Sequence, residues 1–152
     1  CISGLRIGYI IAQEKIINNL LKLNQHLITC PVTLIEQYVT EYFSELVRLT
    51  RPQIKKIIRQ RQKITQYLNK IGLKYLPGSA TFYFMVQVAD SRLIADDFAW
   101  KLLREYQVAV VPGTGYGKST AGYVRVSVGA ESLTRIKRGL DRVKKLIELT
   151  KK

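Results

Sequence analysis

Cysteine, histidine and long apolar runs are scarce in this sequence of 152 residues, and each scarcity excludes a class of protein. The two cysteines, Cys1 and Cys30, give neither a disulfide framework nor a metal-ligand spacing. The single histidine stands apart from any cluster of cysteines and carboxylates, so we expect no metal site. No apolar run has the length that crosses a membrane, and no segment has the pattern of a signal peptide. We therefore expect a cytoplasmic protein that does not enter a membrane.

Positive charge, by contrast, is plentiful. Lysine and arginine number 25 against 11 aspartate and glutamate residues, which gives a net charge of +14. This balance suits nucleic-acid binding, but the basic residues are spread over most of the chain and are not interleaved with stacking aromatic residues. We therefore predict no specific nucleic-acid partner, and the alternative function is a non-catalytic basic binding or assembly module.

Apolar residues recur at the spacing of amphipathic helices through the first half of the chain. The pattern predicts helices over residues 14–24 and 34–46, and a third that begins at Pro52 and stops at Gly72. A break between the last two helices is expected at Thr50–Pro52.

The second half of the chain changes to short strands and two helices. Strands are predicted over residues 73–76, 80–88, 108–111 and 123–128. One helix is predicted from a cap at Asp96 to about Tyr106, and a last one over residues 132–149. These elements predict an α+β layer in which helices pack on a mostly antiparallel sheet.

The stretch Val110–Val128 contains the first candidate site residue. Its second strand alternates, with valines on one face and Tyr123, Arg125 and Ser127 on the other. A guanidinium on such a stiff element presents a fixed fork of donors, which suits a carboxylate or a phosphate. The alternative is an ordinary strand whose arginine points into water.

Arg6 is the second candidate, because it lies inside Leu5–Ala12, an apolar run with the composition of a strand. An arginine buried there without an anion would be costly. It therefore either binds an anion or lies in solvent on an edge strand.

The loop Pro112–Ser119 has the composition of a phosphate-binding loop but not its spacing. That motif requires a glycine five positions before its Gly-Lys-Ser, and Pro112 occupies this position. A strand also follows the loop where a helix is required. We therefore expect no nucleotide site, and the glycines are expected to serve as turn residues.

Four segments resemble, in the same order, motifs of class I and II aminotransferases, the fold-type-I enzymes that use pyridoxal 5′-phosphate (PLP). They are G-L-R-I-G-Y at 4–9, P-G-S-A-T-F-Y-F at 77–84, V-A-V-V-P-G at 108–113 and G-Y-V-R-V-S-V at 122–128. The resemblance covers essentially the whole chain.

This resemblance implies roles for three side chains. Arg6 matches the arginine that binds the phosphate of PLP, and Arg125 matches the arginine that binds the α-carboxylate of the substrate. Phe82 is the candidate for the aromatic residue near the substrate side chain; alternatively, Phe82 belongs to the core. The substrates would be an amino acid and a 2-oxo acid, and the enzyme would be a homodimer.

The resemblance also implies that the chain is the C-terminal portion of an α/β enzyme. Residues 1–50 would be a remnant of the large cofactor-binding domain with one strand, 51–72 the connecting helix, and 73–152 the small C-terminal domain. The family's Schiff-base lysine lies eight residues before the arginine matched by Arg6, at a position before Cys1. We therefore expect this fragment to be inactive alone and the complete protein to be a PLP-dependent transaminase, with no catalytic residue in the fragment.

Overall fold

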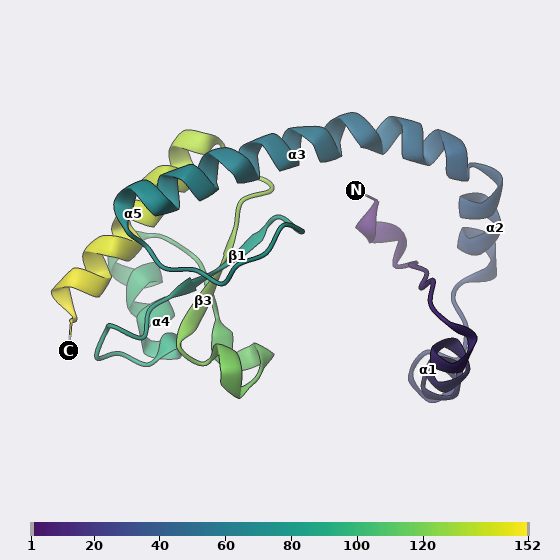
Figure 1. Cartoon of the computed structure of the whole chain (residues 1–152), viewed down its shortest axis with the longest axis horizontal. Coiled ribbons are helices and arrows are strands. Elements are labelled where there is room, and N and C mark those ends of the chain that lie inside the picture. The colour runs from purple at the N-terminus through teal and green to yellow at the C-terminus, as the bar shows by residue number, and fades with distance from the viewer. Residues whose placement is uncertain (1, 152) are drawn as a thin grey trace. The chain divides into compact units, whose positions relative to one another are not determined.

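A computed structural model describes residues 2–151 of the chain (Figure 1). The chain divides into two compact units, one up to Ile54 and one from Lys55 onward. Helix α3, Phe43–Ile71, runs through this division. No helix among the described residues is long and apolar enough to cross a membrane.

The first unit is built of helices. A single 3-10 turn, Ser3–Leu5, precedes α1 at Glu14–Leu27 and α2 at Thr33–Glu41, and α3 follows. The strand predicted in Leu5–Ala12 is wrong, because this run has no regular structure after the turn. A strand needs a neighbour for its backbone hydrogen bonds, and residues 2–54 contain no second strand.

Helix α3 is continuous where the sequence predicted a break. Pro52 lies inside α3 and does not open a new helix. A proline removes one helical hydrogen bond at a cost of about 3 kcal/mol, and here long stretches of helix on both sides keep theirs. The end of α3 agrees with the prediction, since the helix ends at Ile71 and Gly72 has a φ of 71°.

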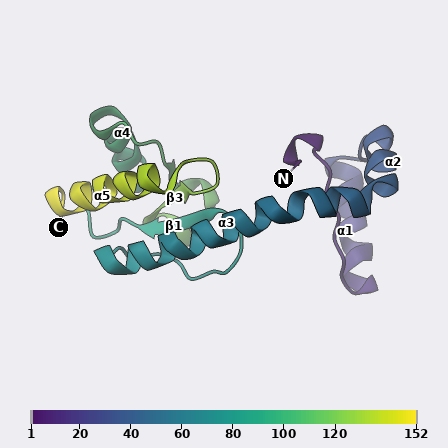
Figure 2. The same cartoon turned by 90° about the horizontal axis from the view of Figure 1, so that it is seen from above.

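The second unit contains a small antiparallel sheet packed with helices, as predicted. Its strands have the order β1-β3-β2, with β1 at Tyr83–Gln87, β2 at Val111–Pro112 and β3 at Tyr123–Ser127. Its helices after α3 are α4 at Ala95–Tyr106 and α5 at Leu133–Leu149. Figure 2 shows α3 and α5 running beside each other, and a hydrogen bond from Tyr67 to Asp141 joins them.

Two predicted strands are shorter than expected. In residues 73–76 only Tyr75 makes a bridge, to Val86, and in residues 108–111 only Val111 enters the sheet. The predicted cap at Asp96 is wrong, because Ile94 occupies the N-cap position of α4 and makes no side-chain cap hydrogen bond. The carboxylate of Asp96 instead accepts a hydrogen bond of 2.9 Å from Thr114 Oγ1. Asp96 lies in the first turn, where its charge favours the helix end without capping it.

The core of the second unit lies between the sheet and its three helices. Apolar side chains that are buried or nearly so come from every one of these elements: Ile64 and Leu68 of α3, Phe84 and Val86 of β1, Phe98 and Leu102 of α4, Val124 of β3, and Ile136, Leu140, Val143 and Leu146 of α5. The sheet therefore has one face committed to the core, and the side chains on its other face are available for a site.

Candidate functional site

Arg125 lies at the middle of the central strand. It pairs with Met85 of β1 on one side and with Val111 of β2 on the other. The alternation predicted for this strand is confirmed, because Val124 and Val128 are fully buried and Arg125 faces away from them. Hydrogen-bonded strands on both sides therefore fix the backbone from which the guanidinium projects.

Two tyrosine rings surround the guanidinium of Arg125. Its Cζ atom lies 4.2 Å from the ring centroid of Tyr83 and 5.1 Å from that of Tyr116. Tyr83 comes from β1 and shares the face of Arg125, while Tyr116 comes from the loop between β2 and β3. Across residues 2–151 the guanidinium has no ion pair or hydrogen bond to a side chain or carbonyl.

This arrangement leaves the donors of Arg125 available. Contacts between a guanidinium and aromatic rings use the flat faces of the cation, whereas its N–H donors lie at the edges. An edge with two parallel donors matches the two oxygens of a carboxylate. The side chain is half-buried, so a bound anion would be partly shielded from water.

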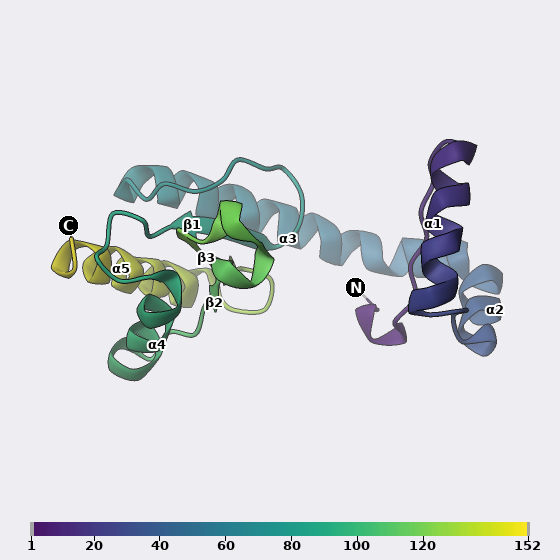
Figure 3. The ribbon, with the colours of Figure 1, turned by 90° about the horizontal axis from the view of Figure 1, so that it is seen from below.

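Close backbone packing holds the loop that carries Tyr116. The loop forms two 3-10 turns, Gly113–Tyr116 and Lys118–Thr120, drawn in green in Figure 3. Thr120 Oγ1 donates a hydrogen bond of 2.8 Å to the carbonyl of Gly113. A Cβ atom at residue 113 would collide with the carbonyl oxygens of Thr120 and Tyr123, so only glycine fits there.

Phe82 lies just before β1 and next to Tyr83. Its ring centroid is 4.3 Å from that of Tyr83, and its side chain packs on the backbone of Gly129. The side chain is 37% exposed, which leaves room for contact with a ligand. Phe82 is the aromatic residue predicted for the site, whereas Tyr83 and Tyr116, whose rings contact Arg125, were not predicted.

A signal for one of these tyrosines was present. Tyr83 is adjacent in sequence to a buried phenylalanine, so strand alternation places it on the outer face with Arg125. Tyr116 lies in a turn, and no periodicity relates it to a strand.

Arg6 belongs to the first unit and is exposed. Its Nη1 atom donates a 3.4 Å hydrogen bond to the carbonyl of Ser3, and its φ is 55°. Arg125 and Phe82 both belong to the second unit. Within the described chain, no group of three or more histidine, cysteine and carboxylate side chains could hold a metal ion.

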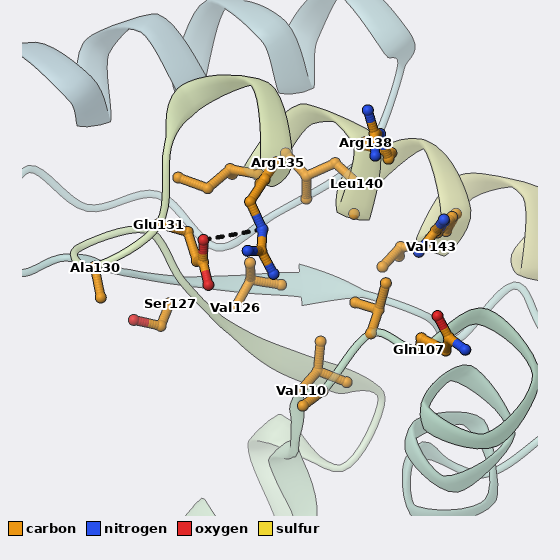
Figure 4. A pocket seen from close by; sticks show the side chains of 15 residues that line it. Gln107, Val110, Val126, Ser127, Ala130, Glu131, Arg135, Arg138, Leu140 and Val143 are labelled. Carbon is orange, nitrogen blue, oxygen red and sulfur yellow. Dashed lines mark ion pairs between the residues drawn. The ribbon is translucent and has the colours of Figure 1, made fainter.

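A cavity of about 690 Å³ lies on the core side of the sheet, between α5 and the segment that leads into β2 (Figure 4). Apolar side chains such as Val110, Val126 and Val143 line it together with the ion pair of Glu131 and Arg135, at 3.1 Å. Because Val126 and Arg125 point to opposite faces of β3, this cavity is separate from the tyrosine-lined arginine.

The family model for aminotransferase class I and II matches residues 2–143. The chain is 30% identical over 147 residues to an aspartate aminotransferase of Pyrococcus abyssi. The matched region covers 95% of this chain and 38% of that protein. It is 32% identical over 146 residues to the (5-formylfuran-3-yl)methyl phosphate transaminase of Methanocaldococcus jannaschii, again over 95% and 38%.

A solved structure agrees with these relatives. The aromatic aminotransferase of Pyrococcus horikoshii matches with a TM-score of 0.73 and 28% identity, over 97% of this chain and 40% of that one. The chain therefore belongs to the class I and II aminotransferase family. It spans about two fifths of the length of these relatives and corresponds to their C-terminal portion.

Proposed function

We propose that this chain is the C-terminal part of an aminotransferase that moves an amino group between an amino acid and a 2-oxo acid. The observation that carries the proposal is Arg125, which is fixed on the central strand, contacted by two tyrosine rings, and without an acceptor of its own in the described part of the chain. Arg125 binds the α-carboxylate, which is the one charged group that every amino acid and every 2-oxo acid shares.

A guanidinium suits this task because it both attracts a carboxylate and fixes its orientation. Two parallel N–H···O bonds fix the plane of a carboxylate, and that plane fixes the direction of the neighbouring carbon. The ring of Tyr83 restricts rotation of the Arg125 fork. Phe82, partly exposed beside Tyr83, is the proposed neighbour of the substrate side chain.

The family generally uses PLP, and the donor set of Arg6 fits the phosphate of this cofactor. The Arg6 guanidinium is exposed, and its one hydrogen bond within residues 2–151, of 3.4 Å to the carbonyl of Ser3, occupies a single donor. Phosphate binding needs several such donors from one guanidinium. PLP supplies the electron sink of the reaction, while this chain holds the phosphate and aims the substrate carboxylate.

The first unit supports the proposal that the chain works within a larger assembly. None of the residues 2–54 is buried, and large apolar side chains such as Leu27, Ile28 and Leu34 are mostly exposed. Apolar surface of this extent is typical of an interface. We propose that it is covered in a homodimer of the complete, cytoplasmic enzyme.

The test uses the protein that contains this chain together with the family's cofactor-binding part. Purified with PLP and given an amino acid and 2-oxoglutarate, it is expected to produce glutamate. Arg125→Ala is expected to abolish most of this transfer while the absorbance of the bound cofactor persists. Absence of transfer with every common amino acid would contradict the proposed reaction.

The net charge of +14 favours a second candidate, a basic module that binds without catalysis. Several of the basic side chains in the second unit already bind other parts of the chain. Arg61 and Arg142, for example, donate hydrogen bonds to backbone carbonyls. The first proposal accounts for Arg125 and the second does not, so we favour the first.

A further inference from the structure

Arg61 of α3 is a buried cation whose donors serve only the backbone. Its side chain is 8% exposed. Nη1 donates hydrogen bonds to the carbonyls of Tyr83 at 2.6 Å and Thr81 at 3.3 Å, and Nη2 donates to that of Gly78 at 2.7 Å. No carboxylate of residues 2–151 pairs with it, and its Cζ lies 4.1 Å from the ring centroid of Phe84. A buried charge is costly to keep, so this arrangement calls for a reason beyond packing.

The segment that Arg61 holds contains a strained turn. Residues 78–82 have no regular structure, and Thr81 has a φ of 63°. A β-branched residue rarely adopts this conformation, which persists only where the surroundings hold it. Thr81 Oγ1 accepts a hydrogen bond of 3.1 Å from the backbone N–H of Tyr83, so the turn leads directly into that residue.

The neighbouring residue of α3 holds the opposite strand at the same level. Gln60 Nε2 donates to the carbonyl of Val128 at 2.6 Å and to that of Glu131 at 2.9 Å. Tyr83 is paired with Ser127, and the N–H of Val128 donates to the carbonyl of Phe82 at 2.8 Å. Two consecutive side chains of α3 therefore fix the end of the β1–β3 ladder next to the Tyr83 ring.

We propose that Arg61 is a positioning residue for the carboxylate site. By binding the carbonyls of Gly78, Thr81 and Tyr83 it fixes the Tyr83 ring against Arg125, and the ring in turn fixes the direction of the Arg125 donors. This inference rests on the proposed function for its consequence, since it assigns to Arg61 the alignment of the group that binds substrate. The first step of the inference, the contact between Tyr83 and Arg125, does not depend on the proposed function, because the structure gives it directly.

The test observes Arg125 directly by NMR of the complete protein that contains this chain, labelled with ¹⁵N-arginine. The Arg125 side-chain signal is assigned by its loss in Arg125→Lys, and the effect of the ring by Tyr83→Leu. Acetate is the probe for carboxylate binding, and acetamide is the uncharged control. We expect the ring current of Tyr83 to displace the Arg125 signal upfield in the wild type, and acetate but not acetamide to move it.

Arg61→Met removes the donors and keeps an unbranched apolar stem. We expect the Arg125 signal to return toward the position of a free arginine and acetate binding to weaken roughly tenfold or more, since small misplacements of a binding group are costly. Arg59→Met, an exposed neighbour on α3, and Val143→Ala, a core change on α5, should leave the signal in place. An unchanged Arg125 signal and unchanged acetate binding in Arg61→Met would overturn the inference.

A further variant keeps the test decisive if Arg61→Met does not fold. Arg61→Lys retains the charge, but one ammonium cannot reach all three carbonyls, so an intermediate displacement of the Arg125 signal is expected. A signal identical to that of the wild type would contradict the proposal. If the wild-type signal responds equally to acetate and acetamide, the proposed carboxylate site fails, while the ring displacement still decides the role of Arg61.

Discussion

The hydroxyl of Tyr67 on α3 donates a hydrogen bond of 2.5 Å to Oδ1 of Asp141 on α5. Lys137 Nζ lies 4.9 Å from the centroid of the same ring. The hydrogen bond to Asp141, then partial burial, and then the negative charge of Asp141 raise the pKa of Tyr67 to about 12, from its usual value of 10. All three causes favour the neutral phenol over the phenolate.

We predict that the second unit loses stability between pH 10 and about pH 12 because of Tyr67. A raised pKa in the folded state means that the stabilisation is complete below the unfolded pKa and is lost as the pH rises through the folded one. Tyr67→Phe should cost ~0.5–1.5 kcal/mol of unfolding free energy at neutral pH and remove this alkaline loss. Urea unfolding across the pH range measures both, with exposed Tyr9→Phe as the control.

Gly113→Ala should destabilise the second unit by about 1–3 kcal/mol, the usual cost of forcing an extra carbon into a packed site. The added Cβ would meet the carbonyl oxygens of Thr120 and Tyr123, which are backbone atoms with little freedom to move. Gly115→Ala is the matched control, because nothing lies within 4 Å of a Cβ there. Equal unfolding midpoints for the two variants would show that the loop relaxes freely.

In the complete enzyme, Arg125→Lys and Arg125→Ala should weaken amino-acid and 2-oxo-acid substrates together. Loss of one partner of a desolvated charge pair costs roughly 2–5 kcal/mol. At ~1.4 kcal/mol per decade this is on the order of 30- to 4,000-fold in kcat/KM. Arg125→Lys should retain more activity than Arg125→Ala, since lysine keeps the positive charge and loses only the pair of parallel N–H donors.

Two controls separate the role of Arg125 from general damage. An amine without an α-carboxylate should react about equally with wild type and variants, and cofactor affinity should hardly change. A kcat/KM for amino acids within about twofold of wild type in Arg125→Ala, or release of PLP, would mean that this strand has another role.

The isolated 152-residue chain should show no transaminase activity and no specific covalent bond to PLP. The position that matches the family's lysine precedes Cys1, and the lysines within the chain, such as Lys118, have no assigned role in such a bond. Visible spectra during a PLP titration, followed by borohydride reduction and peptide mapping, measure this. Stoichiometric modification of one lysine would refute the prediction.

Binding of the chain to nucleic acid should be weak and sensitive to salt. A net charge of +14 attracts phosphates through counterion release, and such affinity falls steeply as the ionic strength rises. Fluorescence anisotropy with duplex and single-stranded DNA measures the dissociation constant at several salt concentrations. A submicromolar complex at about 0.2 M salt would favour the basic binding module.

Periodicity predicted most of the fold because local patterns determine most of it. The helix from about Ser132 follows from apolar residues at helical spacing, and the stop at Gly72 follows from glycine's conformational freedom. Both predictions are confirmed. The helix through Pro52 and the missing strand in Leu5–Ala12 could not be predicted this way. Both features depend on which other backbone groups are available as hydrogen-bond partners, and a local sequence pattern does not contain this information.

The candidate site, too, was predictable only where a local pattern determines it. Arg125 was found because strand alternation separates it from its valine neighbours. The two tyrosines that contact it come from segments about 40 and 9 residues before it in the chain, and only the folded sheet and loop bring them together. Arg61 is not among the predicted site residues, because no local pattern shows that this basic residue is buried.

The strand order β1-β3-β2 also constrains the order in which the sheet can be made. The middle strand is the last of the three to leave the ribosome, and the two outer strands make no ladder with each other. A nascent chain that ends at Gly122 would carry both outer strands, with Tyr83 and Tyr116, but would lack the strand with which both pair. Strand β1 would keep only its bridge to Tyr75. The sheet and the carboxylate site can therefore form only after Tyr123–Ser127 has been synthesised, because this one segment contains both the central strand and Arg125.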